Sequence, residues 1–184
     1  RFGITVTDSL DSYYNSFIMA STNEENNKVI TESYNKLRVL NPGQPSPKFV
    51  NYKNYEGEIT SLDDLTGKYV YIDVWATWCA PCKVEIPFLK EIEKQYHEKN
   101  IAFVSVSVDM SKDYDKWRKM VKKEELGGIQ LFADKNFESD FIKNYMIQGI
   151  PRFILIDPQG NIVTANAPRP SDKKLKELFD ELTI

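Results

Sequence analysis

Apolar residues occur along this chain in two kinds of segment, and the first kind is a short continuous run. Residues 69–76 read YVYIDVWA and residues 101–108 read IAFVSVSV, so both runs combine aromatic, β-branched and small residues. Such runs are typical of strands that are covered on both faces of a sheet. Shorter runs at 129–134, 152–157 and 162–165 predict three further strands. The last two flank the turn sequence PQGN, so we expect them to form an antiparallel hairpin.

The second kind of segment is amphipathic and lies between these runs. Residues 80–96 predict a helix, because the following apolar residues recur at roughly helical spacing: Val84, Phe88, Leu89, Ile92 and Tyr96. Pro87 lies inside this segment and should kink the helix, since it removes a backbone donor. Further helices are predicted at 113–124, 138–146 and 172–182. Strands that alternate with helices indicate an α/β sheet with a parallel centre.

The N-terminal part of the chain has a different character. Residues 1–42 are polar and rich in Asn, with apolar side chains at helical spacing that predict one helix from about Thr22 to Arg38. The sequence NPGQPSP then ends the helix and marks a domain boundary, so residues 43–184 form the main domain. The extension is either the remnant of an upstream domain or a helix packed on the main fold. A short hairpin around Glu56 and Gly57 opens the domain.

Composition and charge exclude several classes of function. The 184 residues include 24 Lys and Arg against 27 Asp and Glu, which gives a net charge of −3 without a basic cluster. Nucleic acid is therefore not an expected partner. No apolar run is long enough to cross a bilayer, so we expect a soluble domain. The chain begins at Arg1 without an initiator Met, which suggests that any signal peptide or membrane tether lies outside it.

Both cysteines of the chain lie in the stretch WATWCAPCK, with two residues between them. A structural disulfide here would close a loop of four residues, which stabilises a fold by about 2 kcal/mol, against about 3 for a fifteen-residue loop. A structural zinc site needs four Cys or His ligands, whereas this chain offers Cys79, Cys82 and His97. We therefore expect no metal, and a dithiol that cycles to a disulfide becomes the leading interpretation.

The position of the pair suits such a cycle. Cys79 falls where a strand gives way to a helix, so its thiolate would meet the positive end of the helix dipole and free backbone donors. This environment should lower the pKa of the Cys79 thiol and raise the thiolate fraction that attacks a disulfide. Cys82, one turn later, can then resolve the mixed disulfide. Pro81 is tolerated in the first helical turn and stiffens the bridge between the sulfurs.

At this point the sequence resembles the thioredoxin superfamily, and within it the TlpA/ResA-like branch of extracytoplasmic thiol-disulfide oxidoreductases. The segment VWATWCAPCK resembles the family's strand and cysteine motif, and GIPRFILIDPQGNI resembles the segment that carries its cis-proline. The elements PSPKF and SLDDLTGK are similar to the same branch, and the resemblance covers roughly residues 43–184. It implies an α/β thioredoxin-like fold, a central mixed β-sheet flanked by helices, with an N-terminal β-hairpin and a helical extension.

The resemblance also implies roles for residues outside the cysteine pair. Asp73 lies six residues before Cys79, where thioredoxins carry a buried acid that shuttles the proton of the second cysteine. Burial would raise the pKa of this carboxyl and make it a usable base near neutral pH. Ile150 and Pro151 match the cis-proline dipeptide that faces the cysteines and binds extended substrate. Arg152 departs from the usual Thr, and it either favours an acidic partner or is a solvated strand end.

Five further residues belong to the expected site. Glu85 matches the glutamate of the family's CxxExP continuation, where it could tune the cysteines or be a plain surface residue. Lys83 is either a thiolate partner or a solvated charge at the start of the helix. Trp78 precedes the first cysteine and should form part of the docking surface, together with Ala80 and Pro81 between the cysteines.

The leading functional hypothesis is a reductase of disulfides in extracytoplasmic proteins that needs no cofactor. We expect disulfide-bearing protein substrates, an upstream thiol protein as electron donor, and a monomer. A thiol peroxidase is the first alternative, because PSPKF and the strand order are shared with peroxiredoxins. Their reactive cysteine, however, follows a Thr by three residues, whereas Thr77 lies two residues before Cys79. A docking module without catalysis is the second alternative, although such modules often lose one cysteine.

Overall fold

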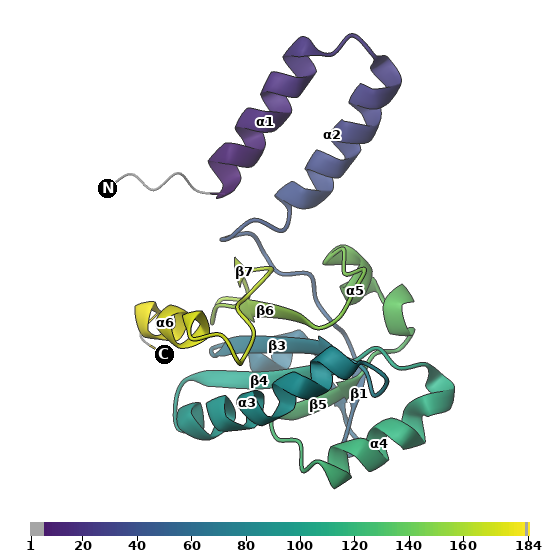
Figure 1. Cartoon of the computed structure of the whole chain (residues 1–184), viewed down its shortest axis with the longest axis vertical. Helices are drawn as coiled ribbons and strands as arrows, with labels where there is room; N and C mark the ends of the chain where they lie inside the picture. Colours follow the sequence, from purple (N-terminus) through teal and green to yellow (C-terminus); the bar gives the residue numbers. More distant parts are fainter. Residues whose placement is uncertain (1–5, 183) are drawn as a thin grey trace.

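The computed structural model describes residues 6–182 and residue 184, and it shows a pair of helices followed by one mixed sheet with helices on both faces (Figure 1). The α-helices are α1 (Val6–Ala20), α2 (Glu24–Arg38), α3 (Ala80–Tyr96), α4 (Tyr114–Lys123), α5 (Asp140–Asn144) and α6 (Lys174–Glu181). The strands are β1 (Tyr52–Asn54), β2 (Ile59–Thr60), β3 (Tyr69–Trp75), β4 (Ile101–Ser107), β5 (Ile129–Phe132), β6 (Arg152–Ile156) and β7 (Ile162–Thr164). Short 3₁₀ helices occupy Leu62–Leu65, Ser111–Asp113 and Asn136–Glu138.

The seven strands lie in the order β2-β1-β5-β4-β3-β6-β7. Strand β4 pairs in parallel with both β3 and β5, while β6 runs antiparallel to β3 and forms a hairpin with β7. At the other edge β1 and β2 form the hairpin expected around Glu56 and Gly57. The predicted thioredoxin-like α/β fold, with its parallel centre and antiparallel last hairpin, is therefore confirmed.

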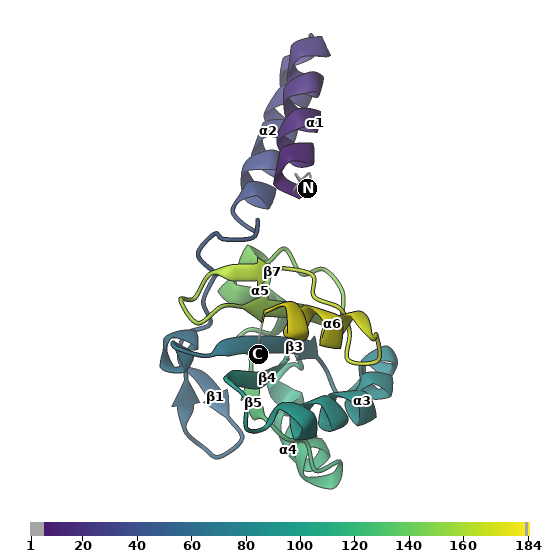
Figure 2. The same ribbon diagram turned by 90° about the vertical axis from the view of Figure 1, so that its left-hand side faces the viewer.

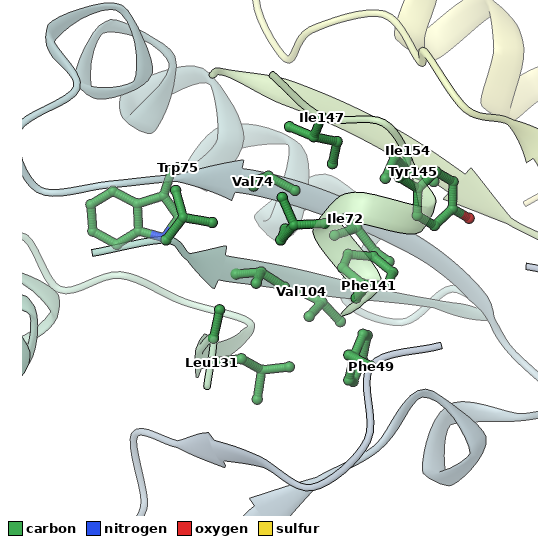
Figure 3. Packing of buried hydrophobic residues seen from close by; sticks show 14 of the residues in the cluster. Phe49, Ile72, Val74, Trp75, Val104, Leu131, Phe141, Tyr145, Ile147 and Ile154 are labelled. Carbon is green, nitrogen blue, oxygen red and sulfur yellow. The ribbon is translucent and has the colours of Figure 1, made fainter. Parts of the chain in front are cut away.

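Side chains alternate between the two faces of the central strands, and each face has its own core. Tyr71 on β3 packs with residues of α3 and α6, which lie on the same side of the sheet in Figure 2. The neighbouring residues Ile72 and Val74 belong to the core on the opposite face, where Phe141 and Tyr145 pack over the sheet (Figure 3). Asp73, between them, shares the face of Tyr71 and therefore lies toward α3.

The buried face of α3 differs from the expected one. Val84 and Phe88 are 63% and 46% exposed, so they do not belong to the core. The residues that α3 buries are Cys82, Glu85, Leu89, Ile92 and Tyr96. This stripe also has helical spacing, and it includes a glutamate that an apolar pattern does not select. Pro87 lies within α3, which nevertheless continues to Tyr96.

Helices α1 and α2 form an antiparallel hairpin that stands away from the sheet (Figures 1 and 2). The rings of Tyr14 and Tyr34 stack with centroids 3.8 Å apart, and the Tyr34 hydroxyl donates a hydrogen bond to Asp11. Helix α2 was expected, but α1 was not, so the prediction of a single N-terminal helix was incomplete. No residue of α2 is buried, and its main partner among the described helices is α1.

Candidate active site

The two cysteines lie where β3 gives way to α3. Cys79 is the N-cap of α3, and its sulfur accepts a hydrogen bond from the Cys82 amide at 3.2 Å. Cys79 and Cys82 form a disulfide with their Cα atoms 5.3 Å apart, and Pro81 lies in the first turn of the helix. The free N–H groups of a helix N-terminus favour negative charge, so this position stabilises a thiolate on Cys79 once the disulfide is reduced.

The disulfide lies just below a partly apolar surface. Cys79 and Cys82 are 3% and 4% exposed, whereas Trp78 is 54% exposed and both Ala80 and Pro81 are exposed. Cys79 is therefore more covered in this oxidised form than expected for an attacking thiol. A reaction partner must approach along the surface formed by these three exposed residues.

A buried carboxylate that the sequence analysis did not select holds the loop before Cys79. Asp109 is fully buried and accepts hydrogen bonds from the Thr77 amide at 2.9 Å, the Thr77 hydroxyl at 2.8 Å and the Ser107 hydroxyl at 2.8 Å. The Thr77 hydroxyl is thus engaged by Asp109. The available signal was an Asp directly after a buried strand, beside the cysteine motif in a parallel pair of strands.

Asp73 lies on β3, opposite Ser105 of β4 in the strand register. It lines a small internal cavity together with Cys82. Burial raises the pKa of Asp73 to about 8, with further contributions from the negative charges of Glu85 and Glu93. The expected rise in the pKa of this carboxyl is therefore confirmed.

Glu85 is a buried residue, which corrects the interpretation that it is a surface glutamate. Its carboxylate accepts hydrogen bonds from the amide and the hydroxyl of Ser171, both at 3.0 Å, and lies 3.5 Å from the Arg169 guanidinium. These contacts join α3 to the segment that precedes α6. The same negative charge raises the pKa of Asp73, so Glu85 acts electrostatically on the site.

The segment with the expected cis-proline lies beside the end of β3. The Ile150–Pro151 peptide bond is cis, as expected. Val74 pairs with Arg152, so continuing the antiparallel register places Pro151 next to the residues that lead to the cysteines. Ile150 packs against the core cluster that includes both cysteines.

Arg152 is half-buried, and one nitrogen of its guanidinium is engaged within the fold. Its Nε donates a hydrogen bond to the Ala165 carbonyl at 2.9 Å, and burial lowers the pKa of the guanidinium. The interpretation as a solvated strand end is therefore wrong. Lys83, in contrast, is exposed on the first turn of α3.

The described residues offer no ready metal centre. Within 6–182 and 184, no group of three or more His, Cys, Asp and Glu side chains is arranged to hold an ion. His97 is exposed, and its Nδ1 lies 3.0 Å from the Lys94 carbonyl. The chemistry that this arrangement supports is thus that of two sulfurs, a polarised helix terminus and a carboxyl of raised pKa.

Comparisons with known proteins agree with this chemistry. A sequence model described as thioredoxin-like matches residues 67–162, slightly more than half of the chain. Thiol-disulfide oxidoreductase ResA of Bacillus cereus is 29% identical over 150 residues, which cover 82% of this chain and 83% of that protein. The thioredoxin-like protein YneN of Bacillus subtilis is also 29% identical, with 81% and 85% coverage.

Solved structures give the same result. A solution structure from Bacteroides vulgatus, assigned as a thiol-disulfide oxidoreductase, is 51% identical, with a TM-score of 0.67 over 77% of this chain and 90% of that one. The thioredoxin domain of thiol-disulfide oxidoreductase BVU-2223, also from Bacteroides vulgatus, is 28% identical, with a TM-score of 0.69 over 79% and 99%.

Proposed function

This chain belongs to the thioredoxin-like family and is a thiol-disulfide oxidoreductase, and from that premise we propose that it reduces disulfide bonds of other proteins outside the cytoplasm. The observation that carries the proposal is the Cys79–Cys82 disulfide at the N-terminus of α3, with Asp73 on the same internal cavity as Cys82. A strained or purely structural cross-link does not require an acid of raised pKa at this position.

In the first half of the reaction, the Cys79 thiolate attacks one sulfur of a substrate disulfide. A bond forms between Cys79 and that sulfur, the substrate disulfide breaks, and the other substrate sulfur leaves as a thiolate that takes a proton from water. The Cys82 amide, which already donates to the Cys79 sulfur, stabilises the negative charge before the attack.

In the second half, Cys82 resolves the mixed disulfide. Its thiol gives its proton to Asp73, and its sulfur attacks the Cys79 sulfur, which releases the second substrate thiolate. The substrate has then gained two electrons, and the protein holds the Cys79–Cys82 disulfide. Because the pKa of Asp73 is raised to about 8, its carboxylate accepts a proton from a thiol near neutral pH more readily than an ordinary aspartate does.

Substrate would bind over the exposed residues that surround the disulfide. The exposed residues Trp78, Ala80 and Pro81 supply one side of this surface, and the half-buried Ile150 and Pro151 supply the other. The hydrogen bond from Arg152 to Ala165 supports a role for this arginine in holding the strand edge rather than in attracting an acidic partner.

The direction and the location of the reaction rest on the resemblance to the TlpA/ResA-like branch. Strong oxidants of the superfamily tend to carry His between their cysteines, whereas this chain has Ala80 and Pro81. An upstream thiol protein would return two electrons to the disulfide after each cycle. None of the described helices is both long and apolar enough to cross a membrane.

We place the catalytic unit at residues 43–184. The Gly43 amide donates to the Ile162 carbonyl and the Ser46 amide donates to the Gly160 carbonyl, so this segment is tied to the β6–β7 hairpin. A chain that begins at residue 43 should therefore retain the reductase activity of the whole chain in an insulin-reduction assay.

The reduction potential tests the direction. Equilibration of the protein with defined ratios of reduced and oxidised dithiothreitol should give a reduction potential of about −270 mV for the Cys79–Cys82 pair, the value of reducing thioredoxins. A reduction potential of about −120 mV, the value of a strong oxidant, would overturn the assignment as a reductase.

A trapping experiment tests the order of the two cysteines and identifies substrates. The Cys82→Ser variant should accumulate mixed disulfides on Cys79 with exported proteins of the host, because the resolving thiol is missing. The matched Cys79→Ser variant should trap far fewer. Equal trapping by both variants, or captured proteins that are cytosolic, would contradict the proposal.

A further inference from the structure

We propose that Glu93 is a second proton carrier of the dithiol site, which exchanges protons with Asp73 across an internal cavity and with solvent at its own exposed edge. The inference deepens the proposed reductase function and rests on it. Glu93 lies on α3, eleven residues after Cys82, and the sequence pattern does not distinguish it from the solvated glutamates around it.

The cavity connects the groups concerned. Its lining includes Asp73, Cys82, Glu93, Gly127 and Gln130, and its volume is about 10 Å³. That volume is close to the space one water molecule needs. The Asp73 carboxyl has no hydrogen-bond partner among the described residues, and Asp73 lines this cavity. A proton that leaves Cys82 for Asp73 therefore has a polar space beside it.

Two glycines form a seat for the Glu93 carboxyl. A Cβ atom on Gly127 would overlap with Glu93 Oε2, and one on Gly128 would lie 2.9 Å from Glu93 Oε1 and 2.7 Å from the Phe103 carbonyl oxygen. The carboxyl group thus lies directly against backbone that only glycine leaves open. An ordinary surface glutamate does not need such a seat, because its head group extends into solvent.

An unpaired acceptor on Gln130 is a second indication that a protonated group lies near the cavity. Its Nε2 donates to the Gly127 carbonyl at 2.7 Å, but its Oε1 is buried without a hydrogen-bond partner among the described residues. A buried acceptor without a donor costs about 1–3 kcal/mol. Gln130 and Glu93 line the same cavity, and a protonated carboxyl, unlike a carboxylate, has a hydrogen to donate.

The charges around the cavity favour a shared proton. Burial raises the pKa of Glu93 to about 7, against the opposing effect of Lys90, and Asp73 lies about one unit higher. Lys90 also lines this cavity, although it is exposed and donates to the Glu124 carbonyl, while β4 and the 126–130 segment place no ionisable side chain on the cavity. Glu85 faces Asp73 from α3. Two acids of similar pKa exchange a proton at little free-energy difference and titrate as a coupled pair.

The Glu93→Gln variant is the first test, with Glu91→Gln on the exposed side of α3 as the matched control. Infrared or NMR titration of the reduced protein should show that the pKa of Asp73 falls in Glu93→Gln, because a negative neighbour is removed. In single turnovers above neutral pH, resolution by Cys82 should slow by about tenfold, less than the 10²–10⁴-fold that a primary acid–base group supplies. The control should match the wild type.

The Gly127→Ala variant is the second test. The backbone at Gly127 does not have a positive φ, so the added methyl group conflicts with the Glu93 carboxyl rather than with the chain. It should displace the carboxyl and reproduce the altered pH profile, and the double variant should be no worse than either single one.

Two results would overturn the role of Glu93. One is an unchanged titration of Asp73 in Glu93→Gln, and the other is a rate loss that is equal at every pH, as expected for a structural defect. The proposed function fails separately, if the wild-type protein does not reduce disulfides at all, and the titration of Asp73 still reports on Glu93 in that case.

Discussion

The carboxyl groups near the cysteines lie in two regions that differ in the hydrogen-bond donors around them. Asp109 lies at the end of β4, where three donors from Thr77 and Ser107 occupy its oxygens. Asp73 lies on the neighbouring β3, where it shares a cavity with Glu93 and no donor of the described chain reaches it. Asp109 is fully buried and Asp73 is half-buried, but the larger difference between the two aspartates is in their hydrogen-bond partners.

This difference gives the two aspartates different roles: Asp109 supports a loop, and Asp73 exchanges a proton. A carboxylate whose lone pairs are filled by fixed donors determines geometry, because breaking it leaves several buried groups unpaired. A carboxyl without donors is neutral at higher pH than usual and can accept a proton during the reaction. The site therefore places a rigid support on the Cys79 side and a titrating pair on the Cys82 side.

The largest expected effect is that of Asp109→Ala on stability. Removing this carboxylate leaves the Thr77 amide and hydroxyl and the Ser107 hydroxyl without their acceptor. An unpaired buried donor costs about 1–3 kcal/mol, so we expect the loss of the acceptor for three donors to lower the free energy of unfolding by about 4 kcal/mol. Urea denaturation at pH 7 measures this change. Asp109→Asn keeps one acceptor oxygen and should lose about half as much, and a loss below about 1 kcal/mol in Asp109→Ala would refute the supporting role.

Asp73→Asn should raise the free energy of unfolding near neutral pH, whereas Asp109→Ala should lower it. The usual pKa of 3.8 rises to about 8 in the folded protein, so the folded state keeps a proton that the unfolded chain has released. Wild-type stability should therefore fall as the pH rises from about 4 to 8, and the variant should lack this fall. Each unit of difference between the folded and unfolded pKa corresponds to about 1.4 kcal/mol. Because the protein relaxes around the charge, we expect Asp73→Asn to be more stable than the wild type by about 3 kcal/mol at pH 8. Parallel stability curves from pH 4 to 9 would contradict this.

Glu85→Gln tests a carboxylate that belongs to both regions, because it is fully hydrogen-bonded yet faces Asp73. The variant keeps one acceptor oxygen for Ser171 but loses its charge. We expect a loss of about 1.5 kcal/mol in the free energy of unfolding, the low end for hydrogen bonds to charged groups. The pKa of Asp73 should fall at the same time, and an unchanged titration of Asp73 would remove Glu85 from the electrostatics of the site.

The smallest effect is expected for Lys83→Gln. Lys83 is exposed beside Cys82, and water screens its charge from the sulfurs. The rate of Cys79 alkylation by iodoacetamide between pH 5 and 9 should therefore change by less than about threefold. A shift of the profile by a full pH unit would show that Lys83 is a thiolate partner.

The central strands were predictable from sequence because strands that are buried on both faces have continuous apolar sequences. Strands β3 and β4 are covered on both faces, so almost every position is apolar, and their ends were placed within one residue. Helix α1 was missed because it faces no core: Tyr14 stacks on Tyr34 of α2, while Tyr13 and Met19 are exposed. The buried face of α3 was misassigned because Val84 and Phe88 fit a helical period as well as the true stripe does.

The cysteines, Asp73 and the cis-proline were predictable because they lie at fixed offsets within two local motifs. Glu85, Asp109 and Glu93 were harder, since their environments come from residues far away in the chain. Ser171 lies 86 residues beyond Glu85, and Thr77 lies 32 residues before Asp109. Glu93 is distinguished only by Gly127 and Gly128, which the sequence presents as the end of a helix.

The contact between Glu85 and Ser171 makes the active-site helix observable from outside it. The Ser171 amide belongs to no helix or strand, yet its hydrogen is held by a carboxylate that is 5% exposed. Its exchange with deuterium should therefore be as slow as that of a core amide, in a segment where neighbouring amides exchange quickly. A loop amide that is distant in sequence from the cysteines would thus record the opening of α3 during the redox cycle.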